Sequence, residues 1–331
     1  MKDSPQIVRQ HFVPACYLAR FTLQGERNSP FFVHSPDGAP VREDIPDHVG
    51  FERHYHDINV PGFRPDHLEF EFQKIEGRAC ALFKTLSAAP GRWLSTEDEK
   101  ETVLFFFAVQ AGRVPQAKDK YEKLIVDAAR NFMEAFAHRP EFFSRAMAAA
   151  KRQGIVIDPI ERERLLEAVD GGHIIPYAGK TQVSVGILRL AYAVLDLVDG
   201  MHYTLLYSDG PDWFVCSDYP AGIFYSVSAG DTLEHPTNIE NPTIQFLTKS
   251  KTIYMPLAYN VALMIHQHDN RPIALKADQR MVAIVNTITI SHARRFICSP
   301  TKDFVCVLPD RRLGNAREGV EALMSFASNE A

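Results

Sequence analysis

The order of sequence patterns along the chain predicts an α+β fold, with a helical layer packed on a largely antiparallel β-sheet. Between residues 66 and 200, apolar residues recur at spacings of three and four, which is typical of amphipathic helices. After residue 200, β-branched and aromatic runs alternate with turn residues, which indicates hairpins. Helices that precede strands, instead of alternating with them, favour segregated layers. We expect a single domain over residues 1–331.

The first part, residues 1–65, is expected to hold an N-terminal signature followed by loops and short strands. In "RQHFVPACYLARFT", Pro14 marks a helix start, because proline is tolerated at the first helical position. Val13, Tyr17 and Phe21 recur at spacing four and form an apolar stripe. We expect this stripe to dock into the body of the fold, since exposing it to water is unfavourable. The rest of this part is rich in Pro, Gly, Asp and His, which indicates turns.

The helical part, residues 66–200, begins after Pro65, where Asp66 can cap a helix that runs to about Leu86. A second helix is predicted from "STEDEK", because Ser95 or Thr96 precedes acidic residues that suit a helix N-terminus. Pro115 is expected to bend or end it. Further helical patterns occupy residues 118–152, with a break at "HRPEFF", then "PIERERLLEAV" and residues 182–197.

The sheet-rich part, residues 201–331, contains the four strand-like runs "MHYTLLYSD", "DWFVCSDYP", "TIQFLTKS" and "TIYMPLAYNVALMIHQ". Turn residues separate these runs, so we expect them to pair as an antiparallel sheet. A helix from Asp278 to Arg294, a short strand "RFICS" and a closing helix from about Ala316 complete the prediction.

Composition limits the classes of function. The formal net charge of −5 gives no general attraction for nucleic acid or anionic lipid, so a nucleic-acid contact would need a local basic cleft. The five cysteines include no CxxC pair and are interpreted as reduced, mostly buried thiols. The N-terminus does not resemble a signal peptide, and runs such as "VLFFFAV" are shorter than a membrane span. We therefore expect a soluble, cytoplasmic protein without a membrane partner.

Several stretches in order along the chain resemble one bacterial family. These are "HFVPACYLARF", "LEFEFQKIE", "VQAGRVP", "WFVCSDYP", "YMPLAYNVAL" and "NTITISHARRFICSP". Together they resemble domain-of-unknown-function family 4238, although Phe12 stands where tyrosine is usual and Tyr219 where asparagine is common. The resemblance implies a stand-alone phage-defence protein. It does not supply a reaction.

Five polar residues within these stretches are candidates for a functional site. His11 lies just before the predicted helix start, where a neutral imidazole would serve as base or ligand. Glu71 is placed at the edge of its helix's apolar stripe, and we expect it to pair with Arg113 on the next helix. Gln110 and Arg113 are three residues apart and share one helix face. Each of these features has an equally simple structural interpretation, in which it only ties elements together.

Asp218 is the fifth candidate. It follows the apolar strand "WFVC" and precedes Pro220, so its carboxylate is expected at the junction of sheet and helices, near Arg113 or His11. There it would act as a base or hold a divalent metal ion. The alternative is an Asx-turn that merely ends the strand, with the carboxylate accepting amides of its own turn.

Two hypotheses of function follow. In the first, the chain is a bacterial phage-defence effector, a hydrolase or nuclease that acts on a nucleic acid or nucleotide. Arg113 would bind the anion and His11 would act as acid or base. Glu71 or Asp218 would act as base or metal ligand. In the second, it is a non-catalytic sensor or ligand-binding module whose polar cluster is structural. An open cleft would favour the enzyme, and a sealed, mutually satisfied cluster the structural role. Homo-oligomerisation is compatible with both.

Overall fold

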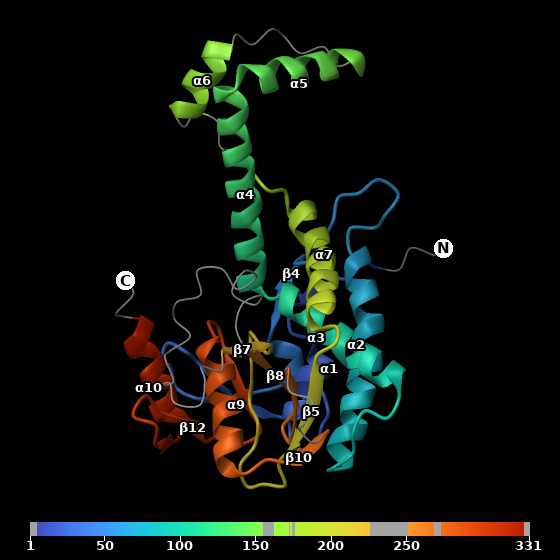
Figure 1. Cartoon of the computed structure of the whole chain (residues 1–331). Coiled ribbons are helices and arrows are strands. Elements are labelled where there is room, and N and C mark those ends of the chain that lie inside the picture. The colour runs from blue at the N-terminus through green and yellow to red at the C-terminus, as the bar shows by residue number, and fades with distance from the viewer. Residues whose placement is uncertain are drawn as a thin grey trace.

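The chain folds into helices and largely antiparallel sheets, so the predicted α+β class is confirmed (Figure 1). The computed structural model describes residues 5–154, 162–171, 173, 176–225, 251–267 and 273–327. The predicted strand "TIQFLTKS" lies outside the described residues. The single-domain organisation stays a prediction.

The described helices follow the predicted order. They are α1 (Ala15–Leu18), α2 (His67–Ala88), α3 (Glu97–Arg113), α4 (Pro115–His138), α5 (Pro140–Arg152), α6 (Arg162–Asp170), α7 (Lys180–Val198), α9 (Gln279–Ser291) and α10 (Ala316–Ala327), with short 3-10 turns η1 (Ala19–Phe21) and η2 (Pro46–His48).

Four sheets account for the described strands. The largest has the order β10-β5-β9-β8-β7 and is antiparallel except where β10 pairs with β5. The second has the order β3-β2-β11-β6, and β1–β4 and β12–β13 form two-stranded ribbons. The strands are β1 (Arg9–His11), β2 (Phe31–His34), β3 (Arg42–Asp44), β4 (Phe51–Arg53), β5 (His202–Tyr207), β6 (Cys216–Ser217), β7 (Gly222–Tyr225), β8 (Lys251–Ala258), β9 (Val261–His266), β10 (Ala274–Lys276), β11 (Ile297–Ser299), β12 (Cys306–Val307) and β13 (Leu313–Gly314).

Helices cover both faces of the five-stranded sheet. On one face, Leu205 and Leu263 belong to the main core together with Phe83 of α2 and Phe106 of α3. Neighbouring residues of the same strands point the opposite way, because side chains alternate along a strand. Their cluster includes Val282 and Val285 of α9. The predicted helical layer is therefore α1 to α3, and α9 adds a second cover.

The N-terminal segment docks into the body, as the sequence predicts. Val13, Tyr17 and Phe21 are all 0% exposed and belong to the main core. The hydroxyl of Tyr17 donates to the carbonyl of Pro256 on β8 at 2.5 Å, which joins the first helix to the large sheet. The chain before Pro14 forms strand β1, which pairs with β4, so His11 ends a strand four residues before α1 begins.

Of the predicted caps, Thr96 accepts a hydrogen bond from the amide of Glu99. Asp278, where a helix was expected to begin, also caps α9 by accepting a hydrogen bond from the amide of Met281. Asp66 precedes α2 as expected but makes no side-chain cap. Its carboxylate accepts hydrogen bonds from the amide of Ile7 at 2.7 Å and from the guanidinium of Arg64 instead. The bond from Ile7 joins the N-terminal segment to the start of α2.

Pro115 separates α3 from α4, which then rises out of the body and carries α5 and α6 at its far end (Figure 1). From Asp119 onward, no described side chain of α4 or α5 is fully buried, and Leu124 and Phe132 are largely exposed. The projecting helices therefore contribute little core of their own.

Among the described helices, α7 alone is long and apolar enough to cross a membrane, a test that a core helix of a soluble protein also passes. Ile187 and Ala191 of α7 share a buried cluster with Ala108 and Val109 of α3. Packing against α3 therefore accounts for the buried face of α7.

Replacing Tyr17 with phenylalanine should lower the free energy of unfolding by about 1–3 kcal/mol, because the buried carbonyl of Pro256 loses its donor while the ring still fills its site. Urea unfolding of the variant and the parent measures the difference. Tyr203→Phe is the matched control, since that hydroxyl reaches the carbonyl of Leu94 only at 3.3 Å from a partly exposed position. Equal stabilities of the two variants would contradict the role of the Tyr17 bond.

Candidate functional site

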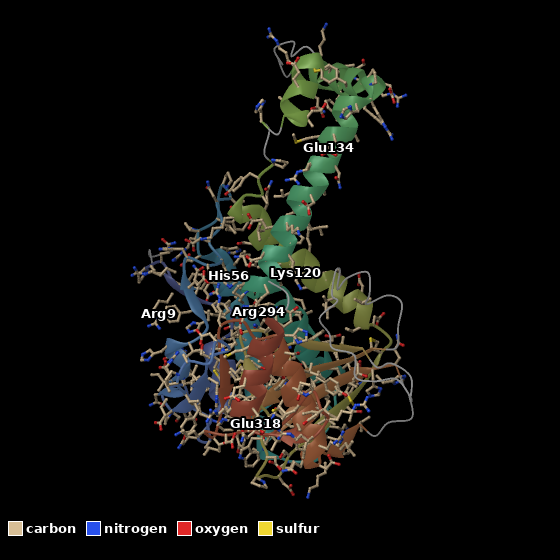
Figure 2. All side chains as sticks on the ribbon, turned by 90° about the vertical axis from the view of Figure 1, so that its left-hand side faces the viewer. Arg9, His56, Lys120, Glu134, Arg294 and Glu318 are labelled. Atoms are coloured by element: carbon tan, nitrogen blue, oxygen red, sulfur yellow. The ribbon has the colours of Figure 1, made fainter. Side chains whose placement is uncertain are left out.

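Arg113, the last residue of α3, lies at the centre of a buried polar cluster between the N-terminal strand and helices α2 and α3. The surrounding side chains come from β1, from the loop after β4 and from both helices. Figure 2 shows one of them, His56, within the body near the lower end of α4. We name this group the arginine cluster; its members are His11, His56, Glu69, Glu76, Gln110 and Arg113.

The guanidinium of Arg113 is 1% exposed and has partners on two elements, α2 and β1. Its Nη1 donates to Oε1 of Glu76 at 2.5 Å, and its Nη2 donates to the backbone carbonyl of His11. Its central carbon lies 4.9 Å from the centre of the Phe72 ring, a cation–π arrangement. Its Nε makes no hydrogen bond within the described residues. The buried charge is thus compensated, while the Nε–H donor remains unused.

The predicted pair of Glu71 with Arg113 is wrong, because the partner is Glu76. The side chain of Glu71 is 43% exposed and binds Lys74 at 2.7 Å. Residues of an α-helix advance by about 100° each, so Glu76 lies about 40° from Phe72 while Glu71 lies about 100° away on the other side. The buried face follows Phe72, Ala79 and Phe83, which turns Glu76 inward and Glu71 toward solvent.

Gln110 and Arg113 share one face of α3, as predicted, and both side chains donate to the backbone of the N-terminal segment. Nε2 of Gln110 donates to the carbonyl of Phe12 at 2.8 Å, next to the carbonyl of His11 that Arg113 binds. Oε1 of Gln110 is buried without a hydrogen-bond partner among the described residues. Two long side chains one helical turn apart therefore hold two consecutive peptide groups.

Glu69 precedes Glu76 by two helical turns on the same side of α2, and sequence reasoning missed both. Glu69 is 3% exposed, and burial raises its pKa to about 7, although the charge of Arg113 acts in the opposite direction. Its Oε2 has no hydrogen-bond partner within the described chain. A spacing of seven residues from Glu69 to Glu76, on the face of Phe72, was the signal in the sequence.

Both histidines of the cluster are held in the neutral form. Burial, followed by the positive charge of Arg113, lowers the pKa of His11 to about 4. The same two causes lower the pKa of His56 well below its ordinary value, and the carbonyl of His11 offsets them only in part. The His56 ring stands edge-on to Tyr55 and Phe72, and neither of its nitrogens makes a hydrogen bond of good geometry in the described structure.

Lys118, in the first turn of α4, lies beside the cluster. Its Nζ donates to the carbonyl of Tyr55 at 2.9 Å and lies 3.8 Å from the centre of the Tyr55 ring. Burial and the nearby charge of Lys180 lower its pKa to about 8. The lysine therefore adds a second cation close to His56, whose pKa it helps to lower.

Asp218 is fully buried at the junction of sheet and helices, as predicted, but it makes different contacts. Oδ1 accepts the amides of Arg294 and Phe296 at 2.9 and 3.5 Å, and Oδ2 accepts Nε2 of Gln116 at 2.5 Å. Among the described residues its hydrogen bonds reach neither His11 nor Arg113. They also do not come from its own turn, where the amide of Tyr219 binds Ser217. Asp218 joins β6, the turn before β11 and α4.

The structure therefore brings together His11, Gln110 and Arg113 and separates Glu71 and Asp218 from them. Within the described residues, no three His, Cys, Asp or Glu side chains meet in a way that could hold a metal ion. The chemical groups on offer are one guanidinium, one carboxyl group with a pKa near neutrality, and two neutral imidazoles. Such a set can bind an anion and transfer protons.

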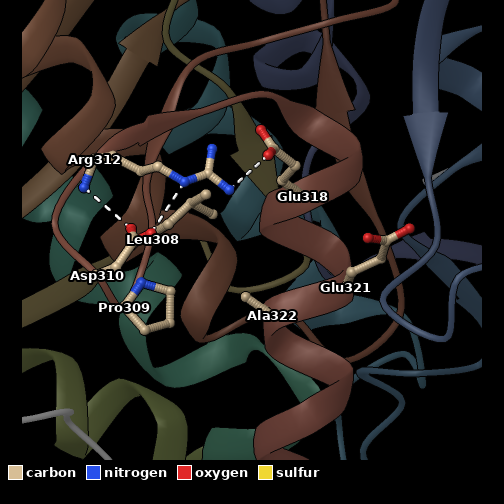
Figure 3. A pocket seen from close by; sticks show the side chains of 7 residues that line it. All are labelled: Leu308, Pro309, Asp310, Arg312, Glu318, Glu321 and Ala322. Atoms are coloured by element: carbon tan, nitrogen blue, oxygen red, sulfur yellow. Dashed lines mark hydrogen bonds and ion pairs between the residues drawn. The ribbon is translucent and has the colours of Figure 1, made fainter.

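Two surface hollows lie away from the cluster, around α10. One, of about 340 Å³, contains Arg312, whose guanidinium is already paired with Asp310 and Glu318 (Figure 3). The other, of about 660 Å³, lies between α10 and the loop that follows β2, and Lys302 and Arg317 line it. No member of the arginine cluster lines either hollow.

The family model described as a protein of unknown function, DUF4238, matches residues 9–303. No curated protein and no protein of solved structure matches the chain.

Glu76→Gln should lower the free energy of unfolding by about 3–5 kcal/mol, because it leaves the buried guanidinium of Arg113 without its counter-charge. The matched control is Glu71→Gln on the same helix, whose exposed pair with Lys74 should contribute at most about 0.5 kcal/mol. Urea unfolding at pH 7 measures both. Similar losses in the two variants would exclude Glu76 as the main partner of Arg113.

Glu69→Gln should alter how stability depends on pH. The folded pKa of about 7 exceeds the ordinary 4.5, so the folded protein keeps a proton that the unfolded chain releases. The contribution of Glu69 to stability therefore falls as pH rises from about 4.5 to about 7 and is constant above that range. Glutamine lacks this proton, so the stability of the variant relative to the parent should rise by on the order of 3 kcal/mol across that window.

Urea unfolding of both proteins between pH 4.5 and 8 measures this difference. The lowered pKa values of His11 and His56 make stability rise with pH below about 6.5, but both proteins contain these residues, so their effect largely cancels. A stability difference that does not change with pH would contradict the raised pKa of Glu69.

Proposed function

The chain belongs to the DUF4238 family, whose function is unknown, and from this premise we propose that it is a bacterial phage-defence effector that hydrolyses a phosphate ester. The substrate class is a nucleotide or nucleic acid. The resemblance of the sequence stretches supports the defence setting. The arginine cluster supports the chemistry.

One observation carries the proposal, namely that titratable groups with displaced pKa values gather around one guanidinium while several of their polar atoms have no partner. Within the described residues, the atoms of the cluster without a hydrogen bond of good geometry are Nε2 of His11, both ring nitrogens of His56, Oε2 of Glu69, Oε1 of Gln110 and Nε of Arg113. A purely structural network is expected to satisfy such atoms, because each unpaired polar group in a core is costly. Groups kept ready for a ligand need not be satisfied in its absence.

The roles follow from charge and pKa. Arg113 and Lys118 are the cations for the phosphate, because a guanidinium matches two phosphate oxygens. Neutral His56 takes a proton from the attacking water as the oxygen–phosphorus bond forms. Glu69, with a pKa of about 7, gives a proton to the leaving oxygen as the second bond breaks. Glu69 thus takes the place predicted for Glu71, as an acid instead of a base.

A ligand can reach this site only if the segment covering it moves. Arg113 is 1% exposed, and the backbone of His11 and Phe12 lies on the cluster, held by Arg113 and Gln110. The proposal therefore includes a closed resting state, in which β1 shields the site until a trigger displaces it. A defence effector must remain inactive before infection, and such closure provides that.

A second candidate is a non-catalytic sensor or ligand-binding module whose polar cluster is structural. The observation that favours it is the closed ion pair between Arg113 and Glu76, which joins α3 to α2 without any opening to solvent at the guanidinium. In that case the cluster would serve only to fix the N-terminal segment.

The variant Glu69→Gln separates the two candidates, because it removes the proposed acid while it should preserve the fold at neutral pH. We expect cells carrying this variant to lose protection against phage. We also expect turnover of RNA, DNA or nucleotides during infection to fall about a hundredfold or more, as for removal of a general acid. Plaque counts and nucleic-acid integrity in infected cells, with melting temperature of the purified protein, measure these effects.

The control is Glu71→Gln, which should protect as the parent does, since its side chain faces solvent. Full protection by a normally folded Glu69→Gln protein would refute the hydrolase and favour the structural cluster. A parent protein that protects against no phage of a broad panel would refute the defence setting itself.

A further inference from the structure

Two thiols meet where the first helix packs on α2. Sγ of Cys16 on α1 and Sγ of Cys80 on α2 are 2.6 Å apart, although 64 positions separate the residues in sequence. A disulfide bond is about 2.0 Å long, so only a small shift separates this contact from a bond. Cys80 lies one helical turn after Glu76, and the thiol of Cys16 also approaches the carbonyl of Glu76.

The two thiols differ in exposure, which gives them different roles. Cys16 is partly exposed, whereas Cys80 is buried. A small oxidant can therefore reach Cys16 first, and Cys80 is in position to react with the product. Cys216 and Cys298 also face each other, across β6 and β11, but both are 0% exposed. The chain thus contains one accessible cysteine pair and one sealed pair.

We propose that Cys16 and Cys80 form a redox site that a peroxide oxidises to a reversible disulfide. This inference is independent of the proposed hydrolase. The peroxide is the required oxidant, because the thiols themselves supply only electrons and protons.

The chemistry balances in two steps. The thiolate of Cys16 attacks one oxygen of the peroxide, the oxygen–oxygen bond breaks, and a sulfenic acid and hydroxide form. The thiol of Cys80 then attacks the sulfenic sulfur, which forms the sulfur–sulfur bond and releases water. With hydrogen peroxide, two thiols lose two electrons and two protons, and two waters result. A dithiol reductant reverses the change by exchange and is itself oxidised to a disulfide.

Oxidation would fasten the N-terminal signature to α2 at the turn that carries Glu76. In the reduced protein, α1 is held on α2 by packing, with Tyr17 and Phe83 in edge-to-face contact. A covalent bond between residues 16 and 80 would add to this by restricting the unfolded chain. The redox state would thereby set how firmly the segment that covers the arginine cluster is held.

The test uses the reduced full-length protein. After treatment with hydrogen peroxide at pH 7.5, the protein is denatured in N-ethylmaleimide, digested without reduction and mapped by mass spectrometry. We expect a peptide linked through Cys16 and Cys80, with the other three of the five cysteines still alkylated. Dithiothreitol should restore all five free thiols. The oxidised protein should melt about 5 °C or more above the reduced form.

Matched variants sharpen the result. Cys16→Ser should form no link and should leave Cys80 alkylated, because its thiol is buried. Cys306→Ser, which alters a cysteine of another cluster, should form the link as the parent does. The proposal is overturned if peroxide converts Cys16 to sulfinic acid while Cys80 stays free, or if both stay free in the parent. The parent's own peptide map decides this even where a variant fails to fold.

Discussion

A guanidinium can leave water only where its charge and donors find partners, and this requirement at Arg113 organises the centre of the molecule. The partners come from elements far apart in sequence, namely the Glu76 carboxylate of α2, the His11 carbonyl of β1 and the ring of Phe72. Satisfying one side chain therefore fixes how α2, α3 and β1 meet. Because water does not reach the guanidinium, loss of a partner would leave its buried charge uncompensated and destabilise this junction.

The same burial shifts the pKa values of the neighbouring acidic and basic side chains in opposite directions. Burial disfavours whichever form is charged, so it raises the pKa of Glu69 and lowers those of His11 and His56. The positive charge of Arg113 adds to the shift of the histidines and reduces that of the glutamate. Glu69 can therefore donate a proton, and His11 and His56 can accept one, next to the fixed positive charge of Arg113.

The N-terminal segment connects the elements around this junction. Its backbone is held by Gln110 and Arg113, the hydroxyl of Tyr17 reaches β8, and Cys16 contacts Cys80. It also lies over the arginine cluster. A change that loosens or fastens this segment therefore acts on the packing of the helices and on access to the cluster together.

The sequence by itself determined the class of fold and most element boundaries, because periodicity, proline and capping residues act within a few positions. Pro115 divides α3 from α4, and Thr96 caps α3. It also indicated His11, Gln110 and Arg113 as members of one site, but together with Glu71 and Asp218, which lie elsewhere. Only the tertiary structure decided which carboxylate meets Arg113, because the choice between Glu71 and Glu76 depends on how α2 is rotated against α3. The partners of Asp218 lie on α4 and before β11, and no local pattern encodes such distant contacts.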